Sequence, residues 1–181
     1  YRERGMCRLQ VDDVDGAYED FTSSIRRAPD ADSYVQRAGI SIRWHRTQEA
    51  RRDLDRAIEL SPAGCPGALL LRASLFDRLG EREAADADLA AAFRLEPDSG
   101  HAFRIRASIL FDRGDIPPAT ADARRSLELA ADNPLSWVML GKCLAAAGDR
   151  EGAGTAFAEA IHRAPEHDRG WIERVRAESL R

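Results

Sequence analysis

Small side chains recur along the chain at fixed intervals, within stretches whose apolar residues follow a helical period. Three sets of five positions hold only Gly, Ala or Ser. The sets are Gly5, Ala38, Ala73, Ala107 and Gly141; Ala17, Ala50, Ala85, Ala119 and Ala153; and Ser24, Ala57, Ala92, Ser126 and Ala160. Two antiparallel helices approach closely only where the facing side chains are small. The pattern therefore predicts a series of helical hairpins that cross at these positions.

Prolines mark the ends of the hairpins, because proline cannot continue a helix. They lie 33, 35 and 68 residues apart, at Pro29, Pro62, Pro97 and Pro165. The last interval is twice 34, so the missing mark falls at Ala131. Glycines that favour a left-handed turn after the first helix stand at Gly80, Gly114 and Gly148. In the second hairpin His45 takes that place.

Counted so that the proline is position 32, each unit has a large residue at position 4, small residues at positions 8, 20 and 27, and usually a large one at position 24. This pattern resembles the tetratricopeptide repeat over the whole chain. The resemblance implies an all-α fold, a right-handed α-solenoid of about five helix–turn–helix repeats plus a C-terminal capping helix. The expected repeats are 1–30, 31–65, 66–99, 100–133 and 134–167, with the capping helix at 168–181. We expect this single array to be part of a longer chain, because the sequence lacks an initiator Met and begins inside a helical pattern.

Position 7 is arginine and position 23 is aspartate in the first four repeats, whereas the fifth has Leu140 and Ala156. In a hairpin that turns near position 15, these two positions lie almost opposite each other. Arginine suits the place because its planar head can meet a carboxylate through two hydrogen bonds. We predict four structural ion pairs: Arg4–Asp20, Arg37–Asp53, Arg72–Asp88 and Arg106–Asp122.

The resemblance also implies a concave face that is lined by the first helices and holds a peptide of a partner. In this family the lining comes mainly from positions 2, 5, 6, 9, 12 and 13. Here they supply an apolar strip of Val35, Ile42, Leu70, Leu71, Ile105, Phe111, Val138 and Met139. Basic residues border the strip at Arg2, Arg43, Arg78, Arg104, Lys142, Arg169 and Arg176. An apolar strip edged by positive charge suits a peptide with apolar anchors and some acidic character. The alternative is that tight curvature closes the strip and makes several of these residues core. The Lys and Asn pair of the chaperone-type carboxylate clamp occurs in no repeat.

Composition narrows the classes of partner. The chain of 181 residues has a formal net charge of −4 without a basic stripe, which disfavours nucleic acid. No apolar run approaches the roughly 20 residues that span a bilayer, so no membrane partner is expected. Three unpaired cysteines, Cys7, Cys65 and Cys143, favour a reducing, cytoplasmic compartment. Arginine outnumbers lysine 26 to 1, which together with abundant alanine suggests a bacterial source.

No pattern of catalytic or metal-ligating residues occurs, so we expect no enzyme activity, metal or cofactor in this segment. Cys7 and Cys143 fall at position 10, where we expect buried packing residues. Trp137 and Trp171 fall at position 4 and are expected in the core. Trp44 stands at an irregular turn, where it either marks an interaction surface or packs on the turn itself.

These observations favour a protein–protein interaction scaffold that binds a peptide segment, of an unidentified protein partner, in its concave groove. One alternative is a regulatory or sensor arm of a larger enzyme or signalling protein. A second is a self-association module, a homo-oligomer in which the helix at 168–181 docks on another copy.

Overall fold

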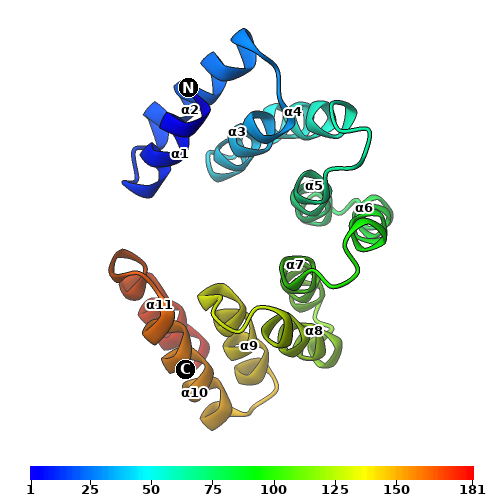
Figure 1. Ribbon diagram of the computed structural model, residues 1–181. Helices are drawn as coiled ribbons and strands as arrows, with labels where there is room; N and C mark the ends of the chain where they lie inside the picture. The colour runs from blue at the N-terminus through cyan, green and yellow to red at the C-terminus, as the bar shows by residue number, and fades with distance from the viewer. The chain divides into compact units, whose positions relative to one another are not determined.

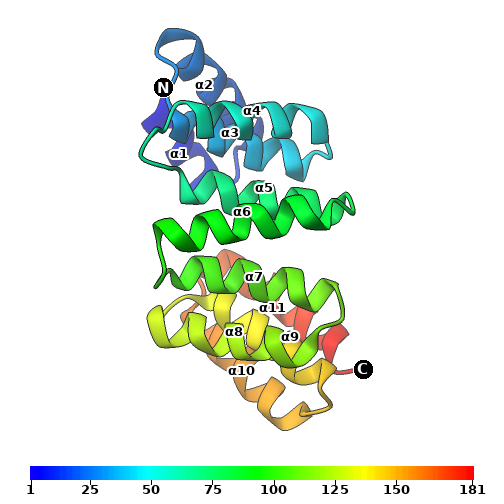
Figure 2. The same cartoon turned by 90° about the vertical axis from the view of Figure 1, so that its right-hand side faces the viewer.

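The computed structural model describes all residues, 1–181. It contains eleven α-helices, joined by turns, and no β-strand. The chain divides into two compact units, Tyr1–Leu95 and Glu96–Arg181. The first unit contains α1 (Arg2–Gln10), α2 (Val14–Arg27), α3 (Ala31–Arg43), α4 (Thr47–Glu59), α5 (Pro66–Arg78) and α6 (Arg82–Leu95). The second contains α7 (Gly100–Asp112), α8 (Ile116–Leu129), α9 (Pro134–Ala146), α10 (Arg150–Arg163) and α11 (Glu166–Ser179). Ten helices pack as five hairpins, α1 with α2 through α9 with α10, and α11 packs on α9 and α10 (Figures 1 and 2).

The turn inside each hairpin uses one residue with a left-handed backbone. Its φ is 81° at Gly80, 89° at Gly114 and 86° at Gly148, as the glycine pattern predicted. His45 and Asp12 adopt the same conformation in the first two hairpins, both with φ of 59°. Non-glycine residues pay a steric penalty in this region, although Asn, Asp and His are enriched among those that enter it. The first two turns therefore keep the hairpin geometry with a less favourable residue.

The three sets of small residues lie where the helices cross, as the repeat pattern predicted. Every one of these residues is buried except Ser24, which is half-buried and accepts a hydrogen bond from the Ser33 hydroxyl at 3.1 Å. The large residue at position 24 lies against position 8 of the same hairpin. Gly5 faces Phe21 and Gly141 faces Phe157. In the three hairpins with alanine at position 8, position 24 is the smaller Leu54, Leu89 or Ala123. The two glycines therefore make room for a phenylalanine ring.

We expect Gly141→Ala to lower the free energy of unfolding by about 1–2 kcal/mol, although alanine is the better helix former. A Cβ at Gly141 would meet three ring carbons of Phe157 at 3.0 Å, and because Phe157 is fully buried its ring can shift only by displacing its neighbours. Urea denaturation measures the change. Gly154→Ala is the matched control because a Cβ there meets nothing within 4 Å, so this substitution should stabilise the chain slightly. In a Phe157→Leu background the Gly141→Ala penalty should disappear, and a penalty that persists there contradicts the account.

Candidate functional site

Three helices of the second unit, α7, α9 and α11, carry the side chains of the candidate site, with α9 in contact with both of the others (Figure 1). The start of α9 is fixed by its own sequence. The side-chain oxygen of Asn133 accepts a hydrogen bond from the amide of Leu135 at 2.9 Å, and Pro134 occupies the first turn. This cap places Leu135 at the beginning of α9, while Trp171 lies in the second turn of α11.

An apolar recess of about 690 Å³ lies between the start of α9, the end of α10 and α11. It is lined by Asn133, Pro134, Leu135, Arg163, Pro165, Asp168, Trp171 and Ile172. Two of its large apolar side chains remain accessible, since Leu135 is 44% exposed and Trp171 is 42% exposed. Accessible aromatic and aliphatic groups in one concavity are typical of a place that receives an apolar side chain.

A second, smaller recess of about 170 Å³ adjoins the first and shares Leu135 and Trp171 with it. Its other lining residues are Arg104, Ser108, Val138, Met139, Lys142 and Val175. Two of them, Arg104 on α7 and Lys142 on α9, bring positive charge. The site thus combines a large apolar space with a small space that has two cations in its wall.

Arg104 has no carboxylate partner, unlike Arg37, Arg72 and Arg106, which each bind an aspartate. Its Nε is buried and has no hydrogen-bond partner. Burial lowers the pKa of the Arg104 guanidinium, and no carboxylate counteracts this shift. Burial and then the charge of Arg104 lower the pKa of nearby His101 as well. A desolvated cation without a counter-ion costs folding free energy, and such costs concentrate at functional sites.

The predicted groove residues of the second unit are only partly available. Val138 and Met139 are buried, with 5% and 6% exposure, and contribute to the site only as walls of the smaller recess. They belong to the hydrophobic core that is formed by α7, α8, α9, α10 and α11. These two members of the predicted strip are therefore core residues, as the alternative of a closed strip requires. Ile105 and Phe111 are half-buried, and Phe111 packs against the same core.

In the first unit, the structure corrects one groove residue and leaves five as candidates. Leu70 is 1% exposed and is a core residue, because α5 is covered there by its neighbouring helices. Val35, Ile42 and Leu71 are half-buried and pack against the core of α3, α4 and α5. Arg43 and Arg78 are exposed. A small recess of about 100 Å³ involves two members of this set, Ile42 and Arg78.

Sequence reasoning missed the two most accessible apolar residues of the site. Trp171 was expected in the core, and this prediction is wrong. Burial at position 4 varies along the chain, from 7% exposure at Leu69 to 54% at Tyr1, and Trp171 is at the accessible end of this range. Leu135 falls at position 2, which is among the concave positions, so the same position rule could have found it.

The four predicted ion pairs are all present in the structure. The Nε–Oδ2 distances are 2.8 Å in Arg4–Asp20, 2.8 Å in Arg37–Asp53, 2.7 Å in Arg72–Asp88 and 2.6 Å in Arg106–Asp122. Each arginine makes a second hydrogen bond to the other carboxylate oxygen. All four carboxylates are buried, and the hydrogen bond from Arg4 lowers the pKa of Asp20. In the fifth hairpin, Leu140 and Ala156 fill this space and are buried at 6% and 2% exposure. In these four hairpins, the guanidinium of the first helix is therefore bound to a buried carboxylate of the second helix.

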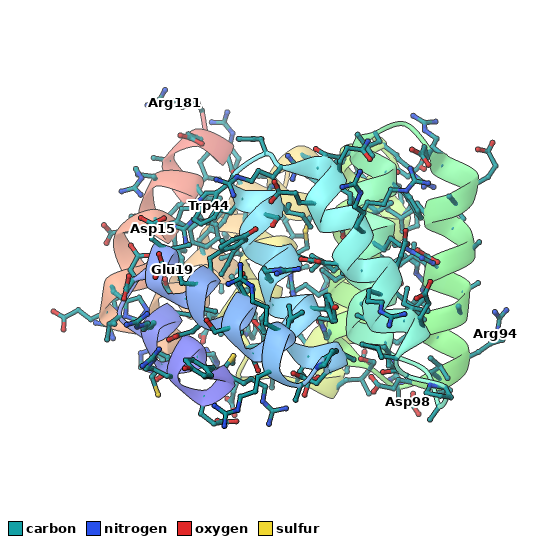
Figure 3. All side chains as sticks on the ribbon, turned by 90° about the horizontal axis from the view of Figure 1, so that it is seen from above. Asp15, Glu19, Trp44, Arg94, Asp98 and Arg181 are labelled. Atoms are coloured by element: carbon teal, nitrogen blue, oxygen red, sulfur yellow. The ribbon has the colours of Figure 1, made fainter.

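Trp44 packs on the first unit itself. Its ring lies 4.9 Å from that of Tyr18 on α2, and the Arg46 guanidinium stacks over it at 4.6 Å. Figure 3 labels Trp44 at the end of α3, together with Asp15 and Glu19 of α2. Of the two possibilities for Trp44, the structure favours packing at the irregular turn. Arg94 on α6 shows the contrasting case of a side chain that points into solvent (Figure 3).

The two cysteines at position 10 differ. Cys143 is buried as expected, and burial raises the pKa of its thiol to about 11. Cys7 is exposed, so the prediction of a buried Cys7 is wrong. Position 10 packs on the preceding hairpin, as Ile40 does on Ala17 and Phe21, and no helix of the described chain covers that face of α1. Cys65 is half-buried.

No three His, Cys, Asp or Glu side chains are grouped so that they could hold a metal ion. None of the eleven helices combines the length and the apolar character that crossing a membrane requires.

Comparison with known proteins fits the hairpin architecture. Residues 66–99 and 135–167 match models of the tetratricopeptide repeat. The crystal structure of a thermophilic tetratricopeptide-repeat protein of Thermus thermophilus superposes on 99% of this chain and 96% of its own, with a TM-score of 0.86 and 18% identity. Residues 66–99 and 135–167 are therefore tetratricopeptide repeats, and the whole chain has the tetratricopeptide-repeat fold.

Other solved tetratricopeptide-repeat proteins share the fold. One from Parabacteroides merdae ATCC 43184 has a TM-score of 0.85 and 18% identity, over 99% of this chain and 70% of that one. YrrB, described as a tetratricopeptide-repeat protein with an unusual peptide-binding site, has a TM-score of 0.56 and 16% identity, over 96% of this chain and 90% of that one. The sequence matches no curated protein. The two matched repeats support a protein-interaction scaffold.

Proposed function

We propose that this chain holds a peptide segment of a partner protein on the α7–α9–α11 face of its second unit, and that no catalysis takes place in this segment. The observation that carries the proposal is the 690 Å³ recess in which Leu135 and Trp171 remain accessible. The large apolar anchor of the segment would enter this recess.

The energetics favour such an occupant. Aromatic residues dominate the affinity of protein interfaces when they are buried near the centre of a contact. Covering Trp171 and Leu135 would remove apolar surface from water, at about 25 cal/mol per Å². The half-buried Arg163 at the edge already pairs with Glu159 and stacks on Trp137, so the wall of the recess is fixed before a ligand arrives.

The test is a selection of displayed random octapeptides on the wild-type chain, followed by titration of resynthesised peptides. We expect Trp171→Ala to weaken their binding about tenfold or more, because the main anchor contact is lost. Leu79→Ala is the matched control. Leu79 is an apolar residue with a similar exposure, 45%, but it lies on the first unit outside this site, so its loss should leave the affinity unchanged.

Melting curves of both variants should stay within a few degrees of the wild type, since neither side chain belongs to the buried core. Failure to select any peptide would contradict the proposal, as would equal binding by wild type and Trp171→Ala. Light scattering across concentrations would then show whether a second copy covers α11 instead.

A further inference from the structure

Resting on the proposed function, we infer that the smaller recess is a carboxylate subsite, in which Arg104 and Lys142 hold an acidic side chain of the bound segment. The acidic residue lies next to the apolar anchor, because the two recesses share Leu135 and Trp171. The partner segment is therefore one in which Asp or Glu stands beside a large apolar residue.

The first observation is the contrast between Arg104 and three arginines of the ion pairs inside the hairpins. Arg37, Arg72 and Arg106 are also partly buried, and each makes two hydrogen bonds to an aspartate. Those aspartates raise the pKa of their arginines, whereas burial alone lowers that of Arg104. The chain thus supplies a carboxylate to each of these three arginines and none to Arg104. A carboxylate of the bound peptide would pair with the Arg104 guanidinium through charge-assisted hydrogen bonds.

The second observation is that another cation shares the recess. Lys142 reaches it from α9, with its Nζ over the Phe111 ring at 4.5 Å from the centroid, and no carboxylate lies within ion-pair distance. Two cations in one small space repel each other, and an anion between them converts that repulsion into attraction. The hydroxyl of Ser108, also in the wall, offers a further donor.

The size and walls of the recess favour a side chain over a chain terminus. Its volume of about 170 Å³ equals that of only a few water molecules, so the ligand group that it holds must be small. Val138, Met139 and Val175 make the rest of the wall apolar. The methylene groups of Asp or Glu match such walls. A terminal carboxylate would bring its backbone and last side chain into the same space.

The experiment uses the same displayed octapeptides, whose ends are both blocked by fusion, selected in parallel on the wild type and on Arg104→Met. The wild type should enrich Asp or Glu next to a large apolar residue. Arg104→Met keeps the length of the stem but removes the charge, so it should lose the acidic enrichment and keep the apolar one. Acidic enrichment of equal strength on both proteins overturns the subsite. Loss of all enrichment on the wild type overturns the proposed function itself.

Resynthesised pairs that differ only by Glu or Gln give the quantitative test. On the wild type, the Glu peptide should bind about tenfold to a hundredfold more tightly than the Gln peptide, as expected for hydrogen bonds between charged groups. On Arg104→Met the two should bind within about twofold of each other, and Arg104→Lys should restore part of the preference. Equal affinity of the Glu and Gln peptides for the wild type overturns the inference. A free-acid version of the Gln peptide that outbinds both would assign the subsite to a chain terminus and also overturn it.

Two further readouts separate binding from a structural role. Since Arg104 is desolvated without a counter-ion, Arg104→Met should melt at the same temperature as the wild type or higher, and a large fall would show that Arg104 supports the fold instead. Lys142 is the only lysine of the chain, so amine acetylation followed by mass spectrometry reports on this recess directly. The Glu peptide should protect Lys142 and the Gln peptide should not. Equal labelling in both cases contradicts the assignment of Lys142.

Discussion

Met139→Asp will lower the free energy of unfolding by about 4 kcal/mol or more, and much of this will appear as loss of the folded second unit. Met139 is 6% exposed on α9 and belongs to the core that contains Ala107, Ala119 and Phe157. Removing a buried methionine costs about 2–5 kcal/mol, and a carboxylate in its place adds the penalty of a desolvated charge. Circular dichroism through a urea titration measures the loss.

Two controls make this result specific. Met139→Leu conserves the volume and should cost less than about 1.5 kcal/mol. Leu71→Asp changes the same repeat position, position 6, where the side chain is only half-buried, so it should cost clearly less than Met139→Asp. If Met139→Asp melted like the wild type, Met139 would be a surface residue and the described core of the second unit would be wrong.

Asp53→Ala will cost about 3 kcal/mol, because it leaves the Arg37 guanidinium partly buried without its carboxylate. Arg37 is 18% exposed and keeps only a hydrogen bond to Thr22 and ring contacts to Tyr18 and Tyr34 after the change. Chemical denaturation of the single variants and of the double variant Arg37→Leu with Asp53→Ala completes a mutant cycle. The double variant should recover much of the loss, since the fifth hairpin fills the same positions with Leu140 and Ala156.

Asp88→Ala is the informative comparison. Arg72 is bound by Asp88 and also by Asp55 of the preceding hairpin, at 2.6 Å, so it retains one carboxylate when Asp88 is lost. We therefore expect Asp88→Ala to cost less than Asp53→Ala. The opposite order, or a double variant no more stable than Asp53→Ala, would mean that the ion pairs do not stabilise the hairpins in this way.

The sequence predicts those parts of the structure that repeat. Position 7 opposite position 23, the small crossings and the glycine turns each recur in several hairpins, so their geometry follows from one hairpin and applies to the rest. The ion pairs could be predicted without coordinates because a change in the fifth hairpin, Leu140 with Ala156, replaces both members together.

The site depends on features that do not repeat. Leu71 and Met139 share a repeat position, yet one is half-buried and the other is core, because burial depends on the neighbouring helices and not on the position. Trp171 is accessible whereas Leu69, at the same repeat position, is buried. The isolation of Arg104 requires that every nearby carboxylate be located, which no sequence pattern provides. Charge and apolar character along the first helices indicated one face of the chain, and the exposure of individual side chains in the structure led us to propose the α7–α9–α11 site on it.

Hydrogen exchange of the wild-type chain with and without a selected acidic–apolar peptide tests the central claim most directly. The account predicts slower amide exchange in α9 and α11, at residues 134–146 and 166–179, with little change in α1 to α4. The same peptide should protect α9 and α11 of the Trp171→Ala variant clearly less at equal concentration. Protection confined to the first unit, or none at a peptide concentration that saturates binding, would contradict the assignment of this face as the binding site.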